Sequence, residues 1–186
     1  MNRFCHLSLL LTLLFTGHTL IGQVSLAPNP IAPEGLSQFQ FLAGNFSVLG
    51  RSKTKGGYLD YQGQWNGYYL LDGYIFTDEF SIKDKLGNVH FLGITYRSYD
   101  PIDDTWTMKF YDGIKREWID TFHGKRKGGE MHLVAKNKDS EGRQFISRIK
   151  FYDMDENGFK WKSDRSYDNG RSWIEDFGII KAIRVQ

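Results

Sequence analysis

The sequence predicts an all-β fold, a single antiparallel, up-and-down β-barrel of about ten strands. From Phe39 onward, runs rich in aromatic and β-branched residues alternate with turn signals about every eight to twelve residues. No segment repeats its apolar residues at the helical period of about 3.6, so we expect no long helix. The 186 residues, 40% of them hydrophobic, are enough for one domain with a sizeable core.

The N-terminal segment predicts a targeting sequence that is not part of the fold. Arg3 precedes an apolar run at 7–15, and a more polar stretch follows that ends near Gly22, as in a cleaved secretory signal peptide. We therefore assign residues 1–22 to a signal peptide and expect a periplasmic or secreted protein with no membrane span in its mature form. Cys5, the single cysteine, precedes the apolar run, so the mature chain would have no disulfide and no lipid anchor.

Residues 23–38 are predicted to form an extended leader, and residues 39–186 the barrel. The leader contains three of the four prolines and shows no periodicity. The predicted strands are 44–52, 57–66, 68–71 continuing through 74–82, 89–99, 105–111, 117–124, 130–136, 143–152, 159–167 and 172–185. The turns between them are predicted at Asn66-Gly67, Asp72-Gly73, Leu86-Gly87-Asn88, Asp100-Pro101, Asp112-Gly113, Gly128-Gly129, Glu141-Gly142, Asn157-Gly158 and Asn169-Gly170.

The last of these turns lies in SYDNGRSW, residues 166–173, which resembles the Asp-box of sialidases and other glycan-acting β-propellers. The chain is too short for the repeated four-stranded blades of a propeller. Tyr-Asp pairs also end several predicted strands, at Tyr99, Tyr111, Tyr152 and Tyr167. The repetition indicates a structural hairpin, in which Asp168 accepts hydrogen bonds from the turn and Trp173 packs under the loop.

Both ends of the predicted barrel resemble a known superfamily. FLAGNF at 41–46 is similar to the Gly-x-Trp signature of lipocalins and fatty-acid-binding proteins, with Phe46 in the Trp position and Arg184 placed to lie over its ring. Together with GQWNGYYLLDGYIFTDEF, GITYRSYDPIDDTW and SYDNGRSW, the chain resembles bacterial lipocalin-like (calycin-type) β-barrel domains over about residues 39–185. The resemblance implies the barrel and leaves the ligand open, because ligands diverge widely in this superfamily.

Alternation along the strands predicts which side chains face the lumen, because successive residues point to opposite faces of a sheet. It directs Arg165 inward on 159–167 and Met108 inward on 105–111. On 89–99 it does not decide between Tyr96 and Arg97. The predicted ligand-binding residues are Arg165, Arg97, Tyr96, Trp106, Met108, Phe110, Trp118 and Trp161.

An inward arginine needs an anionic partner, because an unpaired buried charge costs several kcal/mol. In one interpretation Arg165 pairs with Glu175, which alternation along 172–185 turns inward, or with Asp78. In the other, Arg165 binds the carboxylate of a ligand through bidentate hydrogen bonds. Both interpretations remain open at this stage.

Three functions fit these features. The first is an exported barrel that binds a small apolar or amphipathic ligand, as a carrier, scavenger or sensor. The second is a barrel enzyme, a cyclase, isomerase or hydratase, with Glu175, Asp78 and His123 as candidate catalytic groups. The third is an accessory protein of polysaccharide utilisation that stacks exposed tryptophans on sugars.

The sequence predicts neither a cofactor nor a metal site. The histidines after residue 22 lack metal-ligand spacing, and no nucleophile or phosphate-binding motif occurs. The nearly balanced formal charge of +2 gives no reason to expect a nucleic-acid partner. The oligomeric state stays open, with a homodimer among the alternatives.

Overall fold

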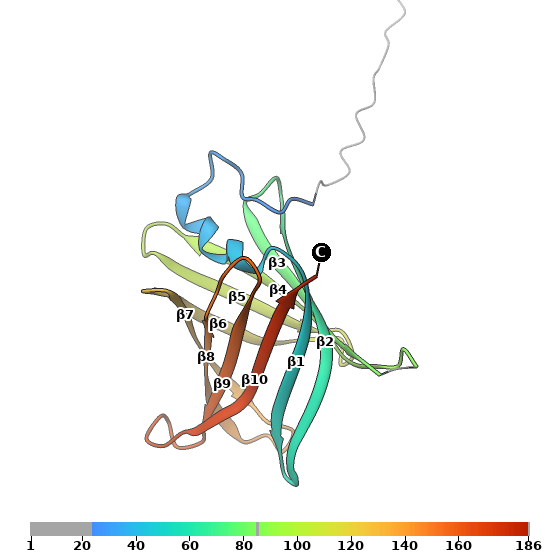
Figure 1. The fold of residues 1–186 in the computed structure, drawn as a ribbon. Coiled ribbons are helices and arrows are strands. Elements are labelled where there is room, and N and C mark those ends of the chain that lie inside the picture. The colour runs from blue at the N-terminus through green and yellow to red at the C-terminus, as the bar shows by residue number, and fades with distance from the viewer. Residues whose placement is uncertain (1–23, 85, 186) are drawn as a thin grey trace, which may run out of the picture.

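The structure is a computed structural model that describes residues 24–84 and 86–185, so the predicted signal peptide and Cys5 lie outside the described residues. It confirms the all-β prediction, because ten antiparallel strands close into one barrel, preceded by a short 3₁₀ helix (Figure 1). The elements are η1 (Glu34–Leu42), β1 (Gly44–Thr54), β2 (Gly57–Leu70), β3 (Ile75–Lys83), β4 (Val89–Asp100), β5 (Thr105–Asp112), β6 (Glu117–Lys127), β7 (Glu130–Lys138), β8 (Gln144–Tyr152), β9 (Gly158–Ser166) and β10 (Ile174–Arg184).

The strands follow an up-and-down order in which each strand pairs with its neighbours in sequence. The barrel closes where β1 pairs with β10, from Phe46 opposite Arg184 to Ser52 opposite Gly178. Closure leaves no exposed sheet edge, and it gives the interior two distinct ends. Helix η1 lies at one end, and the β1–β2 and β9–β10 hairpins lie at the other (Figure 1).

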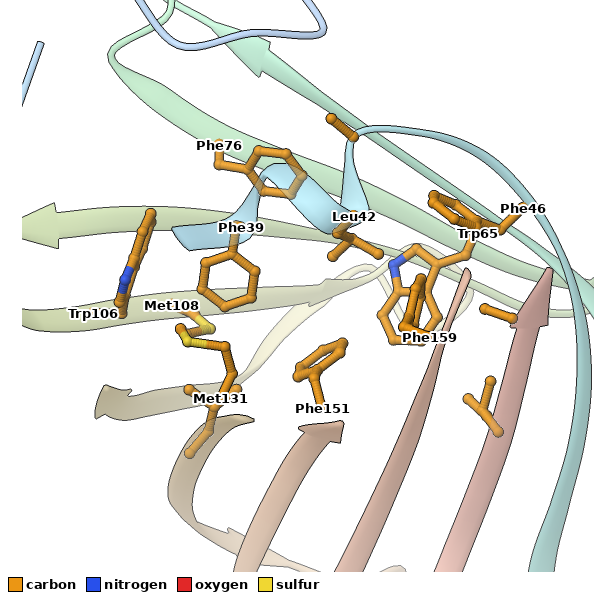
Figure 2. Close-up of a cluster of buried hydrophobic side chains, with 14 of the residues drawn as sticks. Phe39, Leu42, Phe46, Trp65, Phe76, Trp106, Met108, Met131, Phe151 and Phe159 are labelled. Atoms are coloured by element: carbon orange, nitrogen blue, oxygen red, sulfur yellow. The ribbon is translucent and has the colours of Figure 1, made fainter. Parts of the chain in front are cut away.

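Helix η1 plugs its end of the barrel with apolar side chains. Leu36, Phe39 and Leu42 are buried, and the Phe39 ring meets Trp106 edge-on at a centroid distance of 4.7 Å. Figure 2 shows Phe39 projecting from η1 toward Met108, and the Phe39 side chain is fully buried. We call this end of the barrel the closed end.

The boundary between leader and barrel differs from the sequence prediction at residue 38. That boundary falls inside η1, and Leu36, which was assigned to the leader, belongs to the core. The segment before η1 is also tied to the barrel, because Ser25 and Tyr69 exchange two backbone hydrogen bonds of 2.7 and 3.1 Å. Burial of apolar side chains, which a proline-rich composition does not reveal, decides this arrangement.

The turn predicted at Asn66-Gly67 is wrong, because β2 runs without interruption from Gly57 to Leu70. Gly67 serves a different purpose, since a Cβ atom there would lie 2.1 Å from the carbonyl oxygen of Leu42. The glycine therefore lets η1 approach the strand closely, which is the other common role of glycine in a strand. The chain reverses at the next predicted turn, Asp72-Gly73, where Leu71 and Asp72 have positive φ angles. The segment 68–71 therefore does not continue into 74–82, because β2 ends at Leu70 and β3 begins at Ile75.

The interaction expected between Arg184 and Phe46 is present. The Arg184 guanidinium carbon lies 4.6 Å from the centroid of the Phe46 ring. Its nitrogens also donate hydrogen bonds to the carbonyl oxygens of Glu156, Ala43 and Phe41. Arg184 thus ties the last strand to the start of the first at the closed end.

The Asp-box hairpin has the geometry of a structural turn. The Asp168 carboxylate accepts hydrogen bonds from the Ser172 amide at 2.9 Å and the Ser172 hydroxyl at 2.6 Å. These bonds lower the pKa of Asp168 below its usual range. Trp173 donates its indole N–H to the Gly170 carbonyl oxygen at 3.2 Å, and its ring lies under Arg148 at 4.1 Å. The Asp168 carboxylate therefore accepts hydrogen bonds from residues of its own turn, as a structural turn residue does.

Candidate functional site

Between the plug and the open end, the barrel encloses a cavity of about 610 Å³. Most of its wall is aromatic or aliphatic, because alternate residues of each strand point inward. A cavity of this size and character is typical of sites that hold one small molecule. Its apolar wall is formed by Tyr61, Trp65, Phe80, Ile82, Phe91, Met108, Phe110, Ile119, Phe122, Leu133, Phe145, Ile149, Phe151, Trp161, Phe177 and Ile180.

The floor of the cavity holds a buried ion pair between Arg97 of β4 and Asp78 of β3. Nε and Nη2 of Arg97 both lie 2.6 Å from Oδ2 of Asp78. The indole N–H of Trp65 donates to Oδ1 at 2.6 Å, and Nη1 of Arg97 contacts the Met108 sulfur at 2.9 Å. The guanidinium also lies 4.5 Å from the Phe39 ring centroid, so the pair joins the plug to the cavity floor.

Burial is the main influence on the ionisation of this pair. Desolvation raises the pKa of Asp78 and lowers that of Arg97, while the attraction between the two opposes both changes. Because an arginine remains protonated in proteins, the pair stays ionic. Each charge has its partner within the protein, so the floor has no free charge for a ligand.

The mouth of the cavity holds a second inward arginine, Arg165 of β9. Its guanidinium lies between two rings, 3.6 Å from the centroid of Phe177 and 4.3 Å from that of Phe145. Within residues 24–84 and 86–185, no carboxylate forms an ion pair with it. Arg165 is therefore positioned by aromatic contacts and keeps its hydrogen-bond donors available toward the cavity.

The predicted pairing of Arg165 with Glu175 or Asp78 is wrong. Asp78 pairs with Arg97, and the Glu175 side chain, 70% exposed, pairs with Arg148 at 3.2 Å. On β10 the inward residues are Gly178, Ile180 and Ala182, so alternation places Glu175 on the outer face. A bulge also interrupts the pairing of β10 with β9 next to Glu175. Ile174 opposes Arg165 and Gly178 opposes Ser163, so the two strands advance by different numbers of residues over this stretch.

Asp164 of β9 stabilises this bulge. Its Oδ1 accepts the backbone N–H of Asp176 at 2.8 Å, and Asp176 has a φ angle of 50°. Its Oδ2 accepts Nε of Arg148 at 2.6 Å. The bulge also brings Phe177 to the cavity wall, where its ring contacts Arg165.

The other predicted ligand-binding residues fall into three groups. Met108, Phe110, Trp161 and Arg97 line the cavity. Trp106 is fully buried outside the cavity wall, in contact with Phe39 of the plug. Tyr96 and Trp118 lie on the outer surface, where their rings are 6.1 Å apart and Trp118 is 58% exposed.

The candidate catalytic groups are not brought together. His123 is exposed on β6, where Nδ1 lies 3.2 Å from the Thr107 hydroxyl. Glu175 is outside the barrel and Asp78 is engaged at its floor. These three predicted groups therefore do not form an acid–base pair facing the cavity.

Among the cavity residues that the sequence reasoning missed are two with polar groups. Trp65, which fixes Asp78, lies on β2 just before the wrongly predicted Asn66-Gly67 turn. Asn137 of β7 lines the cavity near its mouth. The signal for Asn137 was alternation, since Met131, Leu133 and Ala135 on the same strand are all buried.

Among the residues described, no group of three or more His, Cys, Asp or Glu side chains is placed to hold a metal ion. No helix within 24–84 and 86–185 is both long and apolar enough to span a membrane. Comparison of the chain with models of known protein families gives no match, and comparison with curated proteins gives none either. The functional argument therefore depends on the site itself.

Proposed function

We propose that this protein binds one small, largely apolar ligand in its barrel, with a carboxylate or a similar polar head held by Arg165. The observation that carries the proposal is an inward guanidinium without an acidic partner among the described residues, at the end of an apolar cavity. A carboxylate satisfies its donors in a bidentate manner, while an alkyl or aryl body covers the aromatic wall.

The proposal also includes a cellular role, a fold family and a location. A barrel that binds without transforming its ligand serves as a carrier, scavenger or sensor. We propose that it is lipocalin-like and acts in the periplasm or outside the cell, after removal of residues 1–22. The features that support this part are the FLAGNF segment with Arg184 over Phe46, and the composition of the N-terminus.

The binding function has more support than the two alternatives. The catalytic groups predicted for an enzyme are not placed for it, because His123 and Glu175 lie outside the cavity and Asp78 is paired with Arg97. Sugar stacking could use Trp118, Tyr96 and Tyr111, whose rings are grouped on the outer surface. That use would leave the cavity and Arg165 without a role.

Substitution of Arg165 tests the proposal. In Arg165→Met an unbranched apolar side chain still packs beside Phe145 and Phe177, while the guanidinium and its charge-assisted hydrogen bonds are lost. Such bonds contribute about 1.5–3 kcal/mol, so a fatty or aromatic acid should bind about ten- to a hundredfold more weakly. Calorimetric titration with a panel of such acids measures the change.

Arg171→Met is the matched control. Arg171 is exposed on the β9–β10 loop, so its replacement removes the same charge from the same end of the barrel. Its affinity for the acids should stay close to that of the unmodified protein. Equal affinities for Arg165→Met and Arg171→Met would show that the head group is bound elsewhere.

A further inference from the structure

Asn137 has a buried polar atom that the protein does not satisfy. Its side chain lines the cavity at the open end of β7, and Oδ1 is shielded from solvent. Within the described part of the chain, this oxygen accepts no hydrogen bond. An unsatisfied buried acceptor is costly, and buried polar side chains otherwise nearly always have a partner.

Asn137 lies beside the arginine that holds the ligand head in the proposed function. Asn137 is directly opposite Phe145 in the pairing of β7 with β8. The same Phe145 ring carries the Arg165 guanidinium at 4.3 Å. The acceptor and the cationic donor therefore flank one aromatic ring at the mouth of the cavity.

The hairpin that follows Asn137 is held rigidly. Oδ1 of Asp139 accepts the backbone N–H groups of Glu141 and Arg143 at 2.9 and 3.0 Å, and Oδ2 accepts Nε of Arg143 at 2.8 Å. A fixed turn next to Asn137 keeps the amide in place, as recognition of a small polar group requires.

We propose that Asn137 accepts a hydrogen bond from the ligand, next to the carboxylate bound by Arg165. The ligand class is then an amphipathic acid with an O–H or N–H group near its carboxylate, as in a hydroxy fatty acid or an N-acyl amino acid. The inference rests on the proposed function, because it requires the ligand to enter with its head at Arg165.

Calorimetric titration with three probes of similar length tests the proposal: dodecanoic acid, β-hydroxydodecanoic acid and N-decanoylglycine. One neutral hydrogen bond predicts that at least one donor-bearing acid binds about three- to tenfold more tightly than dodecanoic acid. The preferred probe distinguishes a hydroxyl from an amide donor. In Asn137→Leu this preference should disappear, while the affinity for dodecanoic acid is retained.

Two controls separate this proposal from the function on which it rests. Arg165→Met should weaken all three acids by a similar factor and keep the preference among them. Lys136→Gln, an exposed neighbour on β7, should change neither. A preference that is absent in the unmodified protein, or that persists in Asn137→Leu, overturns the role of Asn137 even where Arg165 binds the carboxylate. Failure of every acid to bind overturns both.

Stability provides an independent measurement. Because Asn137→Leu replaces an unsatisfied acceptor by an apolar side chain in an apolar cavity, the unliganded variant should melt at the same temperature as the unmodified protein or higher. A lower melting temperature would show that Asn137 is structural and would overturn the proposal.

Discussion

Two arginines point into this barrel, and their neighbours give them different roles. Arg97 is 3% exposed and its charge is matched by Asp78, so it contributes to the structure of the floor. Arg165 lies at the mouth between two phenyl rings, and the described residues provide no acid for it. The type of residue is the same, and the partner within reach distinguishes the structural role of Arg97 from the binding role that we propose for Arg165.

Replacement of Arg97 by Met should be strongly destabilising, because it leaves the Asp78 carboxylate buried without its cation. Breaking a buried ion pair on one side costs about 3–5 kcal/mol. Urea denaturation should show this loss in the free energy of unfolding. The double variant Asp78→Asn with Arg97→Met should recover a large part of it, because no charge then remains at the floor.

The stability of the single variant Arg97→Met should depend on pH in a characteristic way. Desolvation raises the pKa of Asp78, and loss of the opposing cation raises it further. A carboxyl group whose pKa is higher in the folded state stabilises that state when protonated, and this stability is lost as the pH rises through the folded-state pKa. The deficit of Arg97→Met should therefore shrink as the pH falls from 7 toward about 4. A deficit that is constant with pH would contradict the ionic character of the floor.

The sequence predicted the inward position of Arg165 but not its partner. Alternation along β9 is regular, so Phe159, Trp161 and Arg165 could be assigned to one face. The partner depended on β10, where Gly178, Ile180 and Ala182 form the inward face and Glu175 therefore lies on the outer one. On β4 both faces carry apolar residues, so alternation could not choose between Tyr96 and Arg97. That choice follows from the cavity and the position of Asp78.

At the scale of elements, Gly67 determines how closely η1 approaches β2. A Cβ atom at Gly67 would meet the Leu42 carbonyl oxygen at 2.1 Å and the Phe76 ring at 2.8 Å. The plug therefore needs a strand position with no side chain. Local sequence signals could not reveal this need, because Asn-Gly is also the commonest signal for a tight hairpin.

Gly67→Ala should destabilise the protein by about 1–3 kcal/mol, as overpacking of a filled core does. Gly56→Ala is the matched control, because nothing lies within 4 Å of a Cβ atom at that position. The control should have nearly unchanged stability or a small gain from reduced freedom of the unfolded chain. Thermal denaturation of the two variants provides the comparison. Equal melting temperatures would show that η1 does not rest on Gly67.

For the whole molecule, the structural contacts at one end of the barrel are separate from the ligand site that we propose at the other end. The closed end holds the plug, with Phe39 fully buried against Trp106 and Arg97. The open end holds Arg165 and Asn137 around the Phe145 ring. The fold class was predictable because the turn spacing of a meander is local. The two ends were not, because they depend on contacts between residues far apart in sequence.

Phe39→Ala and Arg165→Met should show opposite effects. Phe39→Ala removes a buried ring and should cost about 3–5 kcal/mol of stability. Its affinity for acids, measured where the variant is folded, should be nearly unchanged because Phe39 does not line the cavity. Arg165→Met should lose affinity and keep its melting temperature. Denaturation and titration are measured on both variants. If Phe39→Ala or Arg165→Met lost both stability and affinity for acids, the two ends of the barrel would not have separate roles.

The chain enters β1 and leaves β10 at the closed end, where Arg184 ties the two together. Within the described part of the chain, the mouth is therefore built from the hairpins β1–β2, β3–β4, β5–β6, β7–β8 and β9–β10, each held by strands on both sides. A hairpin can be lengthened or replaced without disturbing closure of the ring, since loop insertions carry a small entropic cost. In the proposed function the ring of strands would stay constant while the loops at the mouth vary, so new ligand preferences would be accessible through changes in one hairpin at a time.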